Sequence, residues 1–257
     1  MPFVREKFGT YHDFALASLT DIYSDTGLDA AEKFEANWLE SALLINDGNG
    51  QFEIKPLPKL AQISPAFGVV TTEVNGDGNA DLYLVQNFYH PQRETGKMAG
   101  GMSVLLYGDG QGGFSEVWPK ESGLAVSADA KGLSVCDLND DAWADFATTI
   151  NNGPTLAFHN NNGFLTENRS VRVRLAGKPG NPTAIGARVT LEISDGSQQT
   201  DEVRAGGGYL SQSTSDLFFG IPPGKQIKRI TVRWPNGTQS DHQPAIDEGK
   251  IVITQTS

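Results

Sequence analysis

An internal repeat of apolar runs and Asx-Gly turns is the feature that most constrains how this chain of 257 residues can fold. Residues 43–52, LLINDGNGQF, match residues 105–114, LLYGDGQGGF, and a shorter copy, FHNNNGF, follows at 158–164. In each copy an apolar run of strand length leads into a turn rich in Asn, Asp and Gly, and an aromatic residue follows the turn. This order is typical of a β-hairpin. The repeat therefore predicts that the middle of the chain is built from recurring antiparallel strands.

Two acidic loops lie between these turns. The first acidic loop, EVNGDGNAD, spans residues 73–81, and the second acidic loop, DLNDDAWAD, spans residues 137–145. Apolar runs of strand length flank both loops, and the two loops are about 64 residues apart, close to the offset of the hairpin turns. One unit of this length is about the size of a β-propeller blade or slightly more. The sequence thus predicts a partial β-propeller of two to three blades at residues 43–165.

The spacing of oxygen-bearing side chains in both loops suits calcium. Calcium is a hard cation that takes six to eight oxygen ligands. Carboxylates and amides recur at loop positions 1, 3, 5 and 9, and position 7 supplies a backbone carbonyl. The predicted ligands are Glu73, Asn75, Asp77, the Asn79 carbonyl and Asp81 in the first loop, and Asp137, Asn139, Asp141, the Trp143 carbonyl and Asp145 in the second.

Each loop departs from the ideal pattern in one place. Glu73 is one methylene longer than an aspartate, and Ala142 takes position 6, where the first loop has Gly78 and a left-handed turn is expected. Magnesium fits less well because it demands tighter octahedral geometry. The alternative is that both loops are ordinary Asx-Gly turns with no metal.

The two ends of the chain have different patterns of apolar and polar residues. Apolar residues at helical spacing predict a helix over 5–25, and Asp29 is the expected N-cap of a second helix over 29–40. We therefore expect a helical segment at residues 1–42. Clean alternation of apolar and polar residues after position 166 predicts a small antiparallel β-domain at 166–257 with one solvated face.

Composition excludes several classes of function. A net charge of −11 disfavours a nucleic-acid partner and favours cations. No apolar run approaches the length of about 20 residues that a membrane span needs, and the first 19 residues lack the apolar core of a signal peptide. The single cysteine, Cys136, excludes an internal disulfide and a cysteine-based zinc site. The four histidines are scattered and no nucleophile–base pair is evident, so we expect no enzymatic activity.

An aromatic segment at residues 86–93, QNFYHPQR, leaves a binding role open. It follows the strand after the first acidic loop and mixes stacking rings with hydrogen-bonding groups. Such a mixture suits a sugar or a peptide, although a packed connection between blades is the simpler interpretation.

Two sets of residues carry a family resemblance. The first acidic loop and the strand after it, VNGDGNADL, together with the second loop, resemble the FG-GAP/VCBS repeats of integrin-like propellers. The C-terminal part is similar to the ASPIC/UnbV domain in the segments NPTAIGARV, AGGGYLSQS, FFGI and VRWPNG, which begin at residues 181, 205, 218 and 232. The pairing is similar to the cartilage acidic protein family and its bacterial relatives.

This resemblance implies a secreted or cell-surface protein with calcium in its blades, a role in adhesion, and no established catalysis. Such propellers have about seven blades, whereas this chain has two full repeats and a partial one. The resemblance therefore implies one of three arrangements: a C-terminal piece of a longer protein, a homo-oligomer that completes the ring, or a helical segment that caps the open arc.

The leading hypothesis is a calcium-binding extracellular or cell-surface adhesion module in which the metal is structural. Its partner would be a glycan or an extracellular protein, or the remainder of a longer chain. The alternative is a carbohydrate-active enzyme, or an accessory carbohydrate-binding part of one, with the segment 86–93 lining its groove.

Overall fold

The computed structural model describes residues 2–162, 166–243 and 249–256. It separates into two compact units, Met1–Leu39 and Glu40–Ser257, and each is described by itself. The domain boundaries expected after residues 42 and 165 stay predictions, and residue 165 lies outside the described residues. No helix in the described part of the chain combines the length and apolar character that a membrane span needs.

The N-terminal unit contains four short helices where one long helix was expected. They are α1 (Pro2–Lys7), α2 (Tyr11–Leu16), α3 (Leu19–Tyr23) and α4 (Asp25–Asp29). The apolar stripe is interrupted because Thr10 and Ser18 act as N-caps, and Ser18 forms a reciprocal capping box with Asp21.

The helix expected over 29–40 is wrong. Asp29 is the last residue of α4, and residues 32–39 have no regular secondary structure. Phe34 and Leu39 remain exposed, so no packed apolar face is available to stabilise a short helix there.

The second unit begins with three antiparallel sheets in chain order. The first is β1 (Ala42–Asn46) with β2 (Phe52–Pro56). The second is β3 (Ala66–Thr72), β4 (Asp81–Gln86), β5 (Val104–Gly108) and β6 (Phe114–Val117), and the third is β7 (Ala130–Cys136), β8 (Asp145–Ile150) and β9 (Thr155–Phe158). The short helices η1 (Lys59–Ala61) and α5 (Pro119–Ser122) lie between strands. Within each of these sheets, strands that are consecutive in the chain pair with each other, and the described strands form no closed barrel.

The first two predicted hairpin turns are confirmed. The Asp47 carboxylate accepts the backbone N–H groups of Asn49 and Gln51 between β1 and β2. Asp109 accepts those of Gln111 and Gly113 in the same way between β5 and β6. The third copy, 158–164, begins at the end of β9, but residues 163 and 164 lie outside the described residues.

The sheets β3–β6 and β7–β9 share one apolar core. Tyr83 of β4 and Phe146 of β8 have ring centroids 4.8 Å apart, and Val85, Leu105 and Leu133 are buried beside them. Gly68 lets β3 approach β7 closely, since a Cβ there would lie 2.6 Å from the Leu133 Cβ and 2.9 Å from the Lys131 carbonyl. The two sheets are therefore packed as one body.

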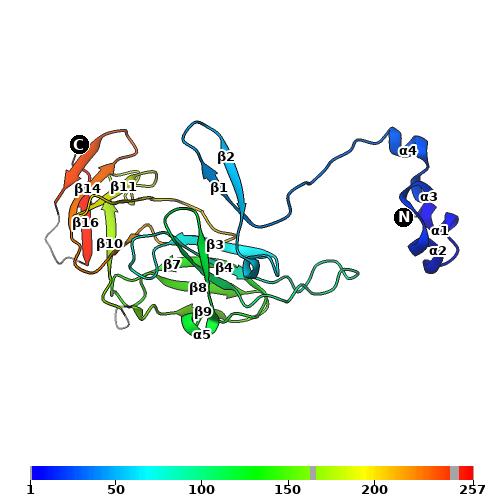
Figure 1. The fold of residues 1–257 in the computed structure, drawn as a ribbon, viewed down its shortest axis with the longest axis horizontal. Coiled ribbons are helices and arrows are strands. Elements are labelled where there is room, and N and C mark those ends of the chain that lie inside the picture. The colour runs from blue at the N-terminus through cyan, green and yellow to red at the C-terminus, as the bar shows by residue number, and fades with distance from the viewer. Residues whose placement is uncertain (1, 163–165, 244–248, 257) are drawn as a thin grey trace. The chain divides into compact units, whose positions relative to one another are not determined.

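The C-terminal strands form a two-layer sandwich, seen in yellow to red in Figure 1. One sheet has the order β13 (Leu217–Ile221), β10 (Arg169–Ala176), β16 (Lys250–Thr254). The other has the order β12 (Gln198–Glu202), β11 (Arg188–Ile193), β14 (Ile227–Arg233), β15 (Gln239–His242). Alternate residues of the two sheets, such as Val173, Leu191, Phe219 and Ile230, meet in a second core, as the alternation predicts.

One strand pair differs from the predicted antiparallel domain. β16 runs parallel to β10, with Arg172 opposite Lys250 and Val173 opposite Ile251. A period-2 pattern is the same for either strand direction, so the sequence does not reveal this orientation.

Neighbouring residues of β16 provide a test of the sandwich core. Ile253 is 3% exposed and Val252 is 66% exposed. We expect Ile253→Ala to lower the free energy of unfolding by about 2–5 kcal/mol, through lost burial and the cavity it leaves. Val252→Ala is the control, and urea unfolding should show a change of less than about 0.5 kcal/mol for it. Equal effects of the two variants would contradict this sandwich.

Candidate metal centres

The two acidic loops occupy the same place in successive sheets. The first loop joins β3 to β4 and the second loop joins β7 to β8. Their backbones also match, because positions 4 and 6 have positive φ in both loops: 81° at Gly76 and 90° at Gly78, and 61° at Asp140 and 72° at Ala142. The left-handed conformation expected at Ala142 is thus confirmed.

The last carboxylate of each loop is fully buried and holds the loop together. Asp81 accepts the N–H groups of Val74 and Gly108, at 2.9 and 3.0 Å. Asp145 likewise accepts the N–H of Leu138 at 2.8 Å, and that of Asn160 at 2.7 Å. These two aspartates join the start of each loop to the end of the third strand of its sheet, at Gly108 in β5 and at Asn160 just after β9.

The middle of each loop has the hydrogen bonds of an Asx turn. Asp77 Oδ1 accepts the Asn79 N–H at 2.7 Å, and the Asn75 amide donates to Asp77 Oδ2 at 3.2 Å. In the second loop, Asp141 takes the corresponding bonds from Trp143 and Asn139.

The structure brings the predicted ligands of each loop into one turn. However, among the described residues no three acidic, histidine or cysteine side chains converge into a group that could hold a metal ion. Any cation here would therefore depend on amide and backbone oxygens as well as carboxylates.

Glu73 is the unusual member of the first loop. It is 5% exposed, and its Oε1 accepts the N–H groups of Asn75 and Gly76, which turns the carboxylate back over its own loop. Its Oε2 is buried with no hydrogen-bond partner among the described residues. Burial and then the charge of Asp81 raise the pKa of Glu73 to about 8. The loop therefore buries one carboxyl oxygen, Oε2 of Glu73, that nothing in the described structure satisfies.

Asp81 adds to this charge. Burial, the largest cause, raises the pKa of Asp81 to about 7, and nearby Asp77 raises it further. The charged groups among the main causes of these two pKa shifts, Asp77 and Asp81, are acidic. The first loop thus buries carboxyl groups, and none of the ion pairs among the described residues gives them a basic partner.

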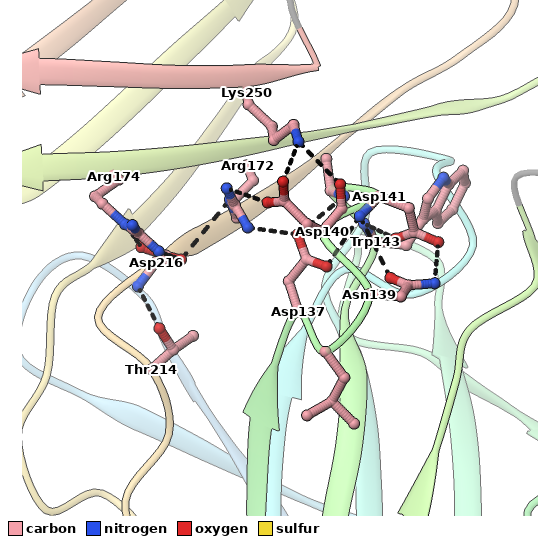
Figure 2. A network of polar contacts seen from close by, with 12 residues as sticks. Asp137, Asn139, Asp140, Asp141, Trp143, Arg172, Arg174, Thr214, Asp216 and Lys250 are labelled. Carbon is pink, nitrogen blue, oxygen red and sulfur yellow. Dashed lines mark hydrogen bonds and ion pairs between the residues drawn. The ribbon is translucent and has the colours of Figure 1, made fainter.

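The second loop is balanced by two basic side chains (Figure 2). Arg172 of β10 contacts Asp137 Oδ2 at 2.6 Å and Asp140 Oδ1 at 2.9 Å. Lys250 of β16 contacts Asp140 Oδ2 at 2.6 Å. Sequence reasoning missed both residues, because the polar positions of the C-terminal strands, β10 and β16 included, were expected to face solvent.

Both loops also contact the C-terminal sandwich through neutral groups. The Asn168 amide donates to the Asn75 carbonyl at 2.9 Å, and the Ser170 hydroxyl donates to the Ala142 carbonyl at 2.7 Å. Gly220 of β13 lies directly against the Glu73 carboxylate and the Gly78 N–H. The predicted metal loops are therefore part of the contact between the two β parts of the second unit.

The segment after the triple glycine completes this contact along β7. The Ser211 hydroxyl both accepts the Leu133 N–H and donates to the Leu133 carbonyl. Ser213 accepts the Val135 N–H at 3.0 Å, and the Thr214 N–H donates to the Val135 carbonyl. These bonds satisfy backbone groups on the edge of β7 that does not pair with β8.

The aromatic segment 86–93 is packed at its start. Asn87 is fully buried and its amide donates to the carbonyls of Gly101, Ser127 and Ala128. The Tyr89 hydroxyl donates to the Ser127 carbonyl at 2.7 Å. These contacts fit the simpler interpretation of a connection between sheets.

A cleft of about 380 Å³ lies between β3 and residues 201–218. Its lining includes Asp201, Glu202, Arg204 and Asp216, and the only aromatic ring among its described lining residues is the buried Phe218. Sugar sites commonly stack the ligand on an exposed ring. The cleft therefore gives little support to a carbohydrate site.

Gly220 offers a test of the close contact at the first loop. A Cβ there would overlap Glu73 Oε2 and lie 2.6 Å from the Gly78 nitrogen. We expect Gly220→Ala to lower the free energy of unfolding by about 1–3 kcal/mol. Gly207→Ala is the control, since a Cβ at Gly207 would meet nothing within 4 Å. Thermal unfolding of both variants measures the difference, and an unchanged Tm for Gly220→Ala would refute the contact.

Comparisons with known proteins give a match for the C-terminal sandwich. A search of curated proteins gives no significant match. Residues 177–257 match the family model described as ASPIC and UnbV. The matched range begins one residue after β10 and includes Gly220 and Lys250, but neither acidic loop. The C-terminal part of this chain thus contains an ASPIC and UnbV domain.

Proposed function

We propose that this chain is a calcium-binding module in which the metal occupies the first acidic loop and has a structural role. The observation that carries the proposal is the buried Oε2 of Glu73, which has no partner among the described residues. A buried carboxylate oxygen without a donor is costly, and a bound cation would remove that cost.

The first loop has the donor set that calcium prefers. Its ligands would be Glu73, Asn75, Asp77, the Asn79 carbonyl and Asp81, all of them oxygen donors. Glu73 is turned over the loop by its bonds to Asn75 and Gly76, and its Oε2 has no hydrogen-bond partner among the described residues. The net charge of −11 further favours the approach of a divalent cation.

The metal would stabilise the contact between the first loop and the C-terminal sandwich. The carboxylate of Glu73 lies against Gly220, so a cation there would strengthen the contact between the first loop and the ASPIC and UnbV domain. A ligand that binds only the folded state stabilises it by about 2.7 kcal/mol at 100 times its Kd.

The wider role in our proposal is extracellular or cell-surface adhesion within a partial β-propeller built of FG-GAP/VCBS-like repeats. Two packed antiparallel sheets with equivalent acidic loops support the repeat, and the ASPIC and UnbV domain supports the family resemblance. The location and a glycan or protein partner rest on that resemblance alone.

The first experiment measures calcium-dependent stability. The protein is stripped with EDTA and then melted with and without millimolar calcium. We expect calcium to raise Tm by about 5–10 °C, and Asp77→Asn to abolish this shift, because the variant keeps the acceptor for Asn79 but loses the charge. Asp47→Asn is the matched control, since Asp47 accepts two N–H groups in a hairpin turn outside both acidic loops. A calcium shift that survives in Asp77→Asn would remove the first loop from the proposal.

A second variant separates the metal's role from ordinary loop stability. Glu73→Gln preserves the size of the side chain and removes the ionisable carboxyl group that would bind the metal. We expect the metal-free variant to be at least as stable as the wild type, while the calcium shift disappears. Loss of stability without calcium, with the calcium shift intact, would show that Glu73 is a structural group and not a ligand.

A further inference from the structure

We infer that Arg172 and Lys250 take the place of a metal ion at the second acidic loop, so that the chain binds one calcium ion and not two. The count of ions rests on the function proposed above. The ion pairs themselves, and their role in joining the two β parts, stand on the geometry of the second loop.

The fold brings the two basic residues to the loop from different parts of the sequence. Arg172 and Lys250 are directly opposite each other in the parallel register of β10 and β16. Val171 and Val173, the neighbours of Arg172 along β10, are buried in the sandwich core, so Arg172 lies on the opposite face of the strand. That face carries Ser170, Arg172 and Arg174, and it meets the second loop and Asp216.

The oxygens of Asp137 are already used. Its Oδ1 accepts the Asp141 N–H at 3.1 Å. Its Oδ2 accepts the Ala142 N–H at 3.0 Å and the Arg172 guanidinium at 2.6 Å. Glu73, at the same position of the first loop, has one oxygen with no partner among the described residues. Position 1 is thus satisfied in one loop and open in the other.

The guanidinium of Arg172 is held on both sides. Figure 2 shows it between Asp137 and Asp140 of the loop and Asp216 of the C-terminal part, whose Oδ2 lies 3.7 Å from Arg172 Nε. The Arg172 side chain is 13% exposed and that of Asp137 is 1% exposed. A dication at this loop would stand beside a fixed positive charge in a site with little screening, so the two would repel each other.

The remaining polar groups of the second loop either contact Lys250 or are exposed to solvent. Lys250 contacts both the carboxylate and the carbonyl of Asp140. Asn139 and Asp141 are exposed to solvent, whereas their counterparts Asn75 and Asp77 are half-buried. No unsatisfied buried carboxylate is left among the second loop's described residues.

The first experiment counts ions by calorimetric titration of the EDTA-stripped full chain with calcium chloride. We expect one ion per chain in the wild type, none in Asp77→Asn, and one, with Kd within twofold of wild type, in the matched variant Asp141→Asn. Two ions in the wild type, or loss of binding in Asp141→Asn, would overturn the inference. Absence of binding in the wild type would instead overturn the proposed function, and the next experiment would still decide the role of Arg172.

The second experiment tests the ion pair in EDTA. We expect Arg172→Gln to lower Tm by about 5–10 °C, because it leaves Asp137 buried with an uncompensated charge. Arg229→Gln is the control, since Arg229 is 48% exposed and its partner Glu192 keeps a second ion pair to Lys228. We expect its loss of Tm to be less than half as large.

A double variant keeps this test decisive if Arg172→Gln is poorly folded. Arg172→Gln with Asp137→Asn removes both charges and should recover at least half of the lost Tm. Millimolar calcium should also raise the Tm of Arg172→Gln in an Asp77→Asn background, where the second loop alone is left to bind it. Equal effects of Arg172→Gln and Arg229→Gln, or no recovery in the double variant, would show that Arg172 does not neutralise this loop.

Discussion

The constraint on which the second unit depends is the burial of negative charge at the contact between its two β parts. Glu73, Asp81 and Asp145 are buried residues, and the Asp137 side chain is 1% exposed. Removing a carboxylate from water costs several kcal/mol unless donors or positive charge replace the lost hydration. Backbone N–H groups meet part of this need in both loops. The remainder is met by Arg172 and Lys250 at the second loop, and it is left open at the first.

The same contact explains the arrangement of the neutral groups around it. Ser211 and Ser213 satisfy the open edge of β7, and Ser170 holds the carbonyl of Ala142 at a backbone conformation that favours glycine. Gly220 is required because a side chain there would collide with Glu73. The motifs that carry the resemblance to the ASPIC and UnbV domain, AGGGYLSQS and FFGI, thus include residues that dock this domain onto the preceding sheets.

Local patterns in the sequence predict local structure in this chain and little more. The alternation of β10, β11 and β14, the turns at Asp47 and Asp109, and the left-handed position at Ala142 all follow from short-range rules. The break-up of the N-terminal helix was visible in principle, since Thr10 and Ser18 are good N-caps. The partners of the acidic loops were not visible, because they depend on a parallel strand pair that joins Arg172 to Lys250 across most of the C-terminal part. The unsatisfied oxygen of Glu73 likewise appears only when Gly220 of another sheet closes over it.

Two ways of neutralising equivalent loops have different physical consequences. An ion pair between Arg172 and Asp137 forms whenever the chain folds, and its low exposure protects it from salt. A calcium ion at the first loop would contribute in proportion to the logarithm of its concentration, and it would contribute nothing when the metal is removed. If both loops relied on metal, a fall in the calcium concentration would leave the carboxylates of both loops without a neutralising charge at the same time. With Arg172 and Lys250 neutralising one loop, the two β parts would stay joined without metal, and calcium would change only the stability of the contact around Glu73 and Gly220.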